Sequence, residues 1–149
     1  MVALGGVPVG GELRDLPQLP GVVWLAPDGI APGRTDVVAA AGLGMPYVDL
    51  IRSAALVVTK PGYGTFVEAV ANGARLLYCR RDDWPETPIL DDWAQAHGVA
   101  AMIGRAELAA GDYGAVAAEL LARPAPEPQE LAGAEIVARR ILELLELER

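Results

Sequence analysis

Short runs of apolar residues alternate with helical stretches along this chain, and this alternation restricts the possible fold more than any other feature. Several runs, such as 56–59 and 75–79, are continuously apolar, as is typical of strands covered on both faces. Strands joined through helices predict a parallel sheet with right-handed crossovers. The expected strands are 2–4, 22–26, 37–40, 56–59, 75–79 and 99–103. We therefore expect an α/β, three-layer, Rossmann-like domain, with a parallel sheet of about six strands and helices on both faces.

Turn and cap residues indicate where the helices begin and end. Thr87 has the character of an N-cap with Pro88 at the first helical position, and Asn72-Gly73 is a favourable C-terminal stop. The expected helices are 46–53, 65–71, 87–97, 113–122 and 131–148, with a proline-rich linker at 124–128. One side of the last helix is apolar and carries Ile136, Val137, Ile141, Leu144 and Leu145.

Composition and charge exclude several classes of protein. The 149 residues have the usual length of one domain, and 52% of them are hydrophobic. The net charge of −8 repels a phosphate backbone, so we expect no nucleic-acid partner. Cys79 is the single cysteine, and the sequence contains no Cys/His cluster for a metal, so neither a disulfide nor a metal is expected.

Targeting signals also point to one setting. The first residues lack the basic start and long apolar stretch of a signal peptide. No run approaches the ~20 apolar residues of a membrane span. The sequence therefore predicts a protein without a transmembrane segment in a reducing, cytoplasmic setting.

The segment between the runs 56–59 and 75–79 carries the clearest chemical signal. A buried strand leads into a turn with Lys60, Gly62 and Gly64, and the turn opens a helix at about Thr65. Ligands of open parallel sheets bind outside the carboxyl ends of the strands. Glycines let a phosphate approach the backbone, and a helix N-terminus offers unpaired N–H groups and a positive dipole end. A phosphate site is one interpretation of this turn.

A simpler interpretation needs no ligand. Proline and glycine are ordinary residues in a turn between a strand and a helix. Thr65 and Glu68 have the T-x-x-E spacing of a capping box. The pattern is neither a Walker A loop nor G-x-G-x-x-G, so neither P-loop NTPases nor NAD enzymes are supported.

The segment 53–73 resembles the C-terminal domain of GT-B-fold glycosyltransferases, together with the following strand Leu76-Leu-Tyr-Cys-Arg-Arg and a helix ending before Gly98. It is similar to the family that makes lipid II, in which a glycine-rich turn runs into T-x-x-E on a helix. The variant Lys60-Pro-Gly-Tyr-Gly is closest to uncharacterised glycosyltransferase-like proteins. The opening Ala3-Leu-Gly-Gly resembles the first strand and glycine turn of the same domain, so the likeness covers nearly the whole chain.

The resemblance implies a donor site for a nucleotide sugar, most simply a UDP-sugar. The residues expected against the donor diphosphate are Gly5, Gly6, Lys60, Gly62, Tyr63, Gly64, Thr65 and Arg80. Glu68 would accept hydrogen bonds from the ribose hydroxyls, a role suited to an ionised carboxylate. Uracil would lie near residues 43–47.

One departure from the family concerns the transferred sugar. Family members commonly carry Asp-Gln or Gln-Gln after the next strand, where this chain has Arg80-Arg-Asp-Asp-Trp-Pro-Glu86. Glu86 is our candidate for the sugar contact. Asp91 and Asp92 are interpreted as first-turn acids favoured by the helix dipole. His97, in the last turn of that helix, is interpreted as a partner of the negative dipole end.

These inferences make residues 1–149 a single nucleotide-sugar-binding domain that corresponds to the C-terminal half of a hexosyltransferase. The resemblance assigns acceptor binding and the general base to an N-terminal domain or partner subunit, absent from this sequence, so we name no catalytic residue and no cofactor. We expect the chain to complete no transfer alone. Two alternatives stay open: a non-catalytic nucleotide-sugar-binding module or sensor, and a nucleotide-sugar 2-epimerase, which the single histidine supports little.

Overall fold

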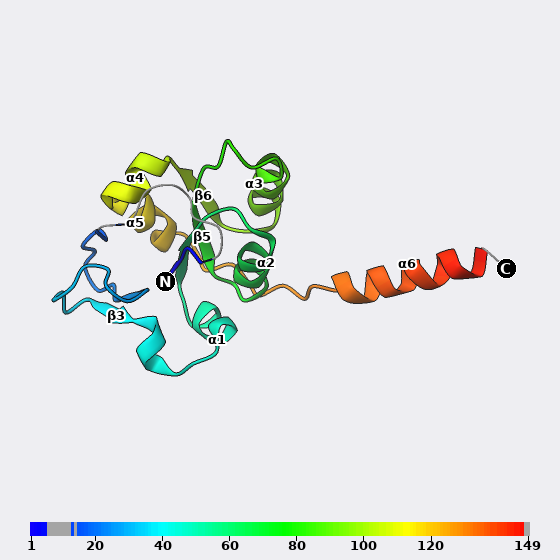
Figure 1. Ribbon diagram of the computed structural model, residues 1–149, viewed down its shortest axis with the longest axis horizontal. Helices are drawn as coiled ribbons and strands as arrows, with labels where there is room; N and C mark the ends of the chain where they lie inside the picture. Colours follow the sequence, from blue (N-terminus) through cyan, green and yellow to red (C-terminus); the bar gives the residue numbers. More distant parts are fainter. Residues whose placement is uncertain (6–12, 14, 148–149) are drawn as a thin grey trace.

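The chain folds into a three-layer α/β body with one helix that leaves it, as the computed structural model describes for residues 1–5, 13 and 15–147 (Figure 1). The main sheet is four-stranded and parallel, in the order β1 (Val2–Ala3), β4 (Leu56–Thr59), β5 (Arg75–Cys79) and β6 (Ala100–Ile103). A second, two-stranded parallel sheet joins β2 (Trp24–Ala26) to β3 (Val37–Ala39).

The expected parallel arrangement is confirmed, but a single sheet of about six strands is wrong. Strand β2 contacts β1 without forming a ladder with it. Strand β1 covers only two residues, so it leaves little backbone for pairing along its second edge. The β2–β3 pair therefore stands as a separate sheet beside the main one.

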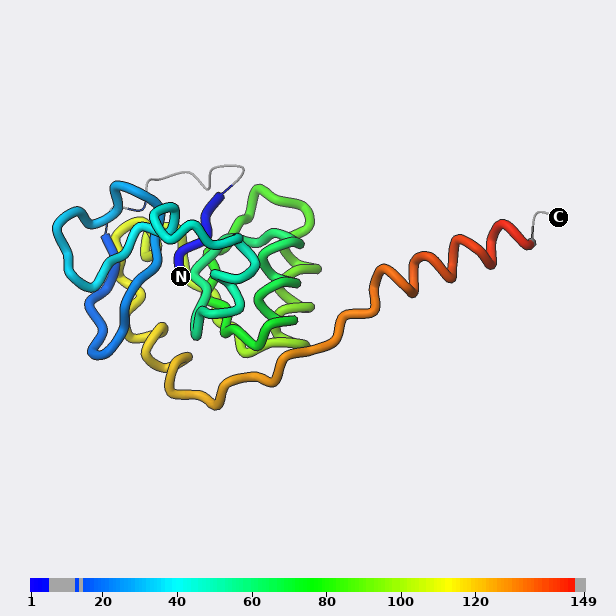
Figure 2. The backbone as a smooth tube through the Cα atoms, turned by 90° about the horizontal axis from the view of Figure 1, so that it is seen from below, coloured from blue at the N-terminus to red at the C-terminus, as the bar shows by residue number. Residues whose placement is uncertain are grey.

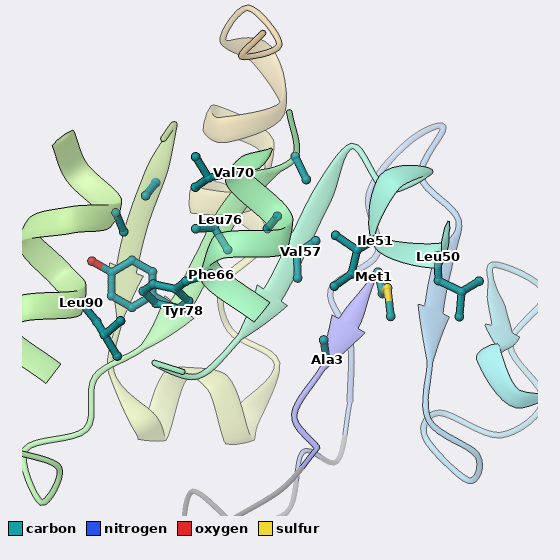
Figure 3. Close-up of a cluster of buried hydrophobic side chains, with 14 residues drawn as sticks. Met1, Ala3, Leu50, Ile51, Val57, Phe66, Val70, Leu76, Tyr78 and Leu90 are labelled. Carbon is teal, nitrogen blue, oxygen red and sulfur yellow. The ribbon is translucent and has the colours of Figure 1, made fainter. Parts of the chain in front are cut away.

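Helices cover both faces of the main sheet, as the sequence predicted. Successive strand residues point to opposite faces, so Val57, Leu76 and Tyr78 enter one core cluster and Val58, Leu77 and Cys79 enter the other. The first cluster, drawn in Figure 3, packs beneath α1 (Tyr47–Arg52), α2 (Tyr63–Ala71) and α3 (Thr87–His97). The second packs beneath α4 (Arg105–Ala110) and α5 (Gly114–Ala122). A short 3-10 helix, Ala40–Leu43, follows β3.

The predicted start of α2 and the predicted N-cap of α3 are wrong. Helix α2 begins at Tyr63 rather than Thr65, because the extended backbone of Gly62 (φ −174°, ψ 131°) serves as its N-cap. Glu86 is the N-cap of α3, so Thr87 is its first residue and Pro88 its second. Asp91 and Asp92 consequently lie beyond the first turn, which contains no acidic residue, and the dipole does not explain them.

The end of α2 is fixed by the linker near the C-terminus. Gly73 follows the helix with φ +71°, and a Cβ built on it would lie 2.6 Å from the Pro126 carbonyl oxygen. The Gln129 backbone N–H donates to the Ala71 carbonyl, and its side-chain amide donates to the His97 carbonyl. Residues 123–129 therefore run along the base of the body, as Figure 2 shows, before α6 (Gly133–Leu147) extends away from it.

Candidate functional site

The two chain paths that leave β1 and β4 diverge at the middle of the body. Strand β1 pairs with β4 along one edge and contacts β2, which follows it in sequence. In open parallel sheets, ligands bind at the carboxyl ends of strands where the connections diverge in this way. The Thr59 hydroxyl donates to the Ala3 carbonyl oxygen (2.7 Å) and ties the two strand ends together. The turn predicted to carry chemistry, Lys60–Gly64, lies at this position.

The N-terminus of α2 opens this turn without a side-chain cap. The N-cap residue is Gly62, which has no side chain to cap the helix. The first-turn N–H groups of a helix have no partner within the helix. The capping box predicted from Thr65 and Glu68 is therefore wrong, because Thr65 lies inside the helix. Its hydroxyl instead lies 2.9 Å from the Tyr47 hydroxyl of α1. Among the described residues, the backbone N–H groups of Tyr63 and Gly64 have no hydrogen-bond acceptor, and they lie at the positive end of the helix dipole.

Neither glycine of this turn is required by the fold. Gly62 has extended backbone that any residue adopts, and its added Cβ would meet only the Lys60 carbonyl oxygen at 3.9 Å. Gly64 is helical, and apart from its chain neighbours and its own helix backbone, no described atom lies within 4 Å of its added Cβ. Gly5, two residues after β1, likewise has no described atom within 4 Å of its added Cβ. Glycine inside a helix costs about 0.5–1 kcal/mol relative to alanine, so Gly64 lowers stability with no packing reason.

Lys60 places a positive charge at the same edge of the sheet. The residue is 9% exposed, and burial lowers its pKa, with a second contribution from the charge of Arg81. Register sets Thr59 beside Tyr78, so Lys60 follows β4 at the level where β5 ends.

The predicted uracil and ribose positions meet on one side of α2. Thr65 and Glu68 are three residues apart, so they share a face of the helix. Tyr47, at the end of the predicted uracil segment 43–47, reaches that face through its contact with Thr65. Glu68 is half-buried there.

The loop after β5 places two adjacent arginines in different surroundings. Arg80 is 60% exposed in its side chain and forms an ion pair with Asp82. Arg81 is buried, with its guanidinium 4.6 Å from the Trp84 ring centre and 3.5 Å from the Asp83 carboxylate. The Trp84 indole donates to Glu86 (3.0 Å). Glu86, our candidate for the sugar contact, thus holds the aromatic ring that covers Arg81.

This loop and α3 line an open pocket of about 450 Å³. Arg81, Thr87 and Asp91 border it, and each has one buried side-chain atom without a hydrogen-bond partner among the described residues. These atoms are Arg81 Nε, Thr87 Oγ1 and Asp91 Oδ1. Thr87 and Asp91 are four residues apart on one face of α3, and burial raises the pKa of Asp91. Sequence reasoning missed this set because it interpreted Thr87 as a cap and Asp91 as a dipole partner. The spacing of four was the signal that could have found it.

The predicted residues therefore divide into two groups. Gly5, Lys60 and the segment 62–65 gather at the carboxyl ends of β1 and β4, while Arg80 faces solvent. Gly6 lies outside the described residues. His97 is in the last turn of α3, as expected, with Nδ1 3.0 Å from the Trp93 carbonyl oxygen.

Two further properties concern metals and membranes. In the part of the chain that the structure describes, no group of three or more His, Cys, Asp or Glu side chains is arranged to hold a metal ion. Over the same residues, no helix has the length and apolar character needed to cross a membrane.

Fold and site together define the protein as an α/β protein with a parallel sheet and a glycine-containing turn at the point where its connections diverge. Comparison with protein-family models, with curated proteins and with solved structures gave no match. The geometry of the chain's own residues is therefore what bears on its function.

Proposed function

We propose that this chain binds a nucleotide-sugar donor, a UDP-sugar, at the turn between β4 and α2, for transfer of the sugar to an acceptor held by another domain or subunit. One observation carries the proposal. The uncapped N-terminus of α2 opens at the carboxyl ends of β1 and β4, behind glycines that the fold does not require. Backbone N–H groups at such a position are suited to an anionic diphosphate.

Each part of the donor has residues of suitable chemistry nearby. The N–H groups of Tyr63 and Gly64 would donate to the diphosphate, with Gly5 leaving room on the other side and Lys60 supplying charge. Glu68 would accept hydrogen bonds from the ribose, and the segment 43–47 would contact uracil. Sugar hydroxyls both donate and accept, so they suit a pocket lined by arginine, threonine and aspartate side chains. We assign the sugar to the pocket of Arg81, Thr87 and Asp91 rather than to Glu86 alone.

The site supplies binding and orientation, and we assign no general base to it. Transfer requires a nucleophile held close to the anomeric carbon, which we attribute to the acceptor-binding partner. Turnover with that partner distinguishes half of an enzyme from a non-catalytic binding module, because both would bind the same donor.

Calorimetric titration of the 149-residue chain with UDP, UMP, ATP and NAD tests the proposal. We expect UDP to bind more tightly than ATP or NAD, because the turn lacks the Walker and dinucleotide patterns. We also expect UDP to bind at least tenfold more tightly than UMP, since UMP lacks the second phosphate. A preference for ATP, or equal binding of UDP and UMP, would contradict the proposal.

A further inference from the structure

A second surface of the body is apolar and shares no lining residue with the polar pocket. Helices α2 and α3 leave between them a groove of about 410 Å³. Its walls include Tyr63 and Val67 from α2, Ile89 and Trp93 from α3, and Ile136 from the first turn of α6. Ile89 is 65% exposed and Tyr63 is 52% exposed. An exposed apolar groove of this kind is typical of an interaction site.

Helix α6 carries an apolar stripe that its own body does not cover. The stripe consists of Val137, Ile141, Leu142, Leu144 and Leu145, each about half exposed. At 100° per residue, Val137, Ile141, Leu144 and Leu145 lie within about 100° of one another, with Leu142 at one border of this side and Ile136 at the other. An isolated helix of 15 residues is marginally stable in water. The stripe therefore requires a surface to pack against.

The groove and the stripe of one chain do not meet, because the linker fixes the root of α6. Gln129 donates hydrogen bonds to the Ala71 and His97 carbonyl oxygens. These bonds hold the linker against the body up to a point four residues before α6 begins. Helix α6 then points away from the body, as Figures 1 and 2 both show. Ile136 remains at one end of its own groove, and the stripe beyond it is free to reach another molecule.

We propose that two copies of this chain form a dimer in which the α6 stripe of each copy packs into the α2–α3 groove of the other. The lengths agree, since the 11 residues of α3 span about 16 Å and the stripe from 137 to 145 spans about 12 Å. Both surfaces are on one chain, so a two-fold axis satisfies both contacts at once.

The surface area buried between the two copies indicates how strong this dimer is. A half-exposed aliphatic side chain offers roughly 50 Å² of apolar surface. Two stripes and two grooves therefore bury on the order of 1,000 Å², at the lower limit for a specific interface and typical of transient ones. The dimer is accordingly weak and depends on protein concentration.

Sedimentation equilibrium of the full 149-residue chain tests the proposal. The unmodified chain should change from monomer to dimer as its concentration rises. Ile141→Glu on the stripe and Ile89→Glu on the groove should each raise the dimer dissociation constant at least tenfold, because each inserts a charge into the apolar contact. Both positions are exposed, so the far-UV circular dichroism of the variants should match that of the unmodified chain.

Matched control variants carry the same charge on exposed positions of the same helices. Arg139→Glu on the opposite side of α6 and Gln95→Glu, on the side of α3 away from Ile89 and Trp93, should change the dissociation constant less than threefold. An equimolar mixture of Ile141→Glu and Ile89→Glu keeps one intact stripe and one intact groove, so it should form a heterodimer that neither variant forms alone.

Three outcomes would overturn the proposal. One is a chain that stays monomeric at several hundred micromolar. Another is an Ile141→Glu variant that dimerises like the unmodified chain. The third is an Ile89→Glu variant whose dimer is unaffected, because pairing of two α6 helices with each other would not involve α3.

Discussion

The two ends of α2 are both marked by glycine, but for different physical reasons. Gly73, after the C-terminal end, has a left-handed backbone (φ +71°), and the linker lies where its Cβ would be. Gly64, in the first turn, is helical and faces open space. The fold therefore requires glycine at position 73 and tolerates any small residue at position 64. Only the first-turn glycine is left for a ligand to explain.

The largest effect on stability is expected at Gly73, after the C-terminal end of α2. Gly73→Ala should lower the free energy of unfolding by about 2–4 kcal/mol, because a left-handed alanine is strained and its Cβ displaces the linker. Urea denaturation measures this loss. Gly133→Ala is the control, since its Cβ meets no protein atom, and should be neutral or slightly stabilising. A loss below 1 kcal/mol at position 73 would show that the linker is not held against α2.

At the ligand end, the largest effect is expected for Glu68→Gln. A carboxylate that accepts hydrogen bonds from the ribose contributes about 1.5–3 kcal/mol to UDP binding, and the amide should lose most of it. Glu68 is not part of a helix cap, so the melting temperature of the unliganded protein should hardly move. Titration of UDP into both proteins, with their melting curves, decides the point. Equal affinities would remove Glu68 from the site.

Gly64→Ala should separate stability from binding. The unliganded protein should become more stable by about 0.5–1 kcal/mol, because alanine favours the helix. UDP affinity should fall about tenfold, or about 1.4 kcal/mol, since the methyl group occupies the space of the diphosphate. Thermal unfolding and calorimetry measure the two quantities. A variant that is more stable and binds UDP unchanged would place the ligand elsewhere.

The smallest effect concerns pH and Lys60. Burial and Arg81 lower the pKa of Lys60 in the free protein, and a bound diphosphate would raise it again. Binding then takes up protons, so UDP affinity should decline as pH rises through the lowered pKa, by about 1 kcal/mol overall. The titrations belong above about pH 7.5, where the terminal phosphate of UDP is already ionised. Lys60→Arg should abolish the decline, and an unchanged slope in that variant would exclude Lys60.

Much of the fold could be predicted because strong local patterns determine it. Strands β4 and β5 match the predicted runs 56–59 and 75–79, since a continuous apolar run has few alternatives to a buried strand. The start of α2 could not be predicted, because Gly62 and Gly64 have low helix propensity and the extended conformation of Gly62 is set by the tertiary fold. Helix α4 is only six residues long, too short for its periodicity to stand out.

The candidate site could be located from the sequence at the turn, but not in the loop after β5. A strand, two glycines and a helix indicate a position at the sheet edge from sequence alone. Arg80 and Arg81 are adjacent and chemically identical, and only the folded loop, with Trp84 over one guanidinium, makes one exposed and the other buried. The unpartnered atoms of Thr87 and Asp91 depend on that same packing.

Binding of UDP at the N-terminus of α2 is tested most directly by an NMR titration of the ¹⁵N-labelled chain with UDP, followed through the backbone amides. Binding at the uncapped N-terminus of α2 predicts that the Tyr63 and Gly64 amides shift most, with smaller shifts around Gly5 and Lys60. The amide of Gly73, at the other end of the same helix, should stay in place. Shifts centred on Gly73 or on α5, or no shift at Tyr63 and Gly64 under saturation, would contradict the account.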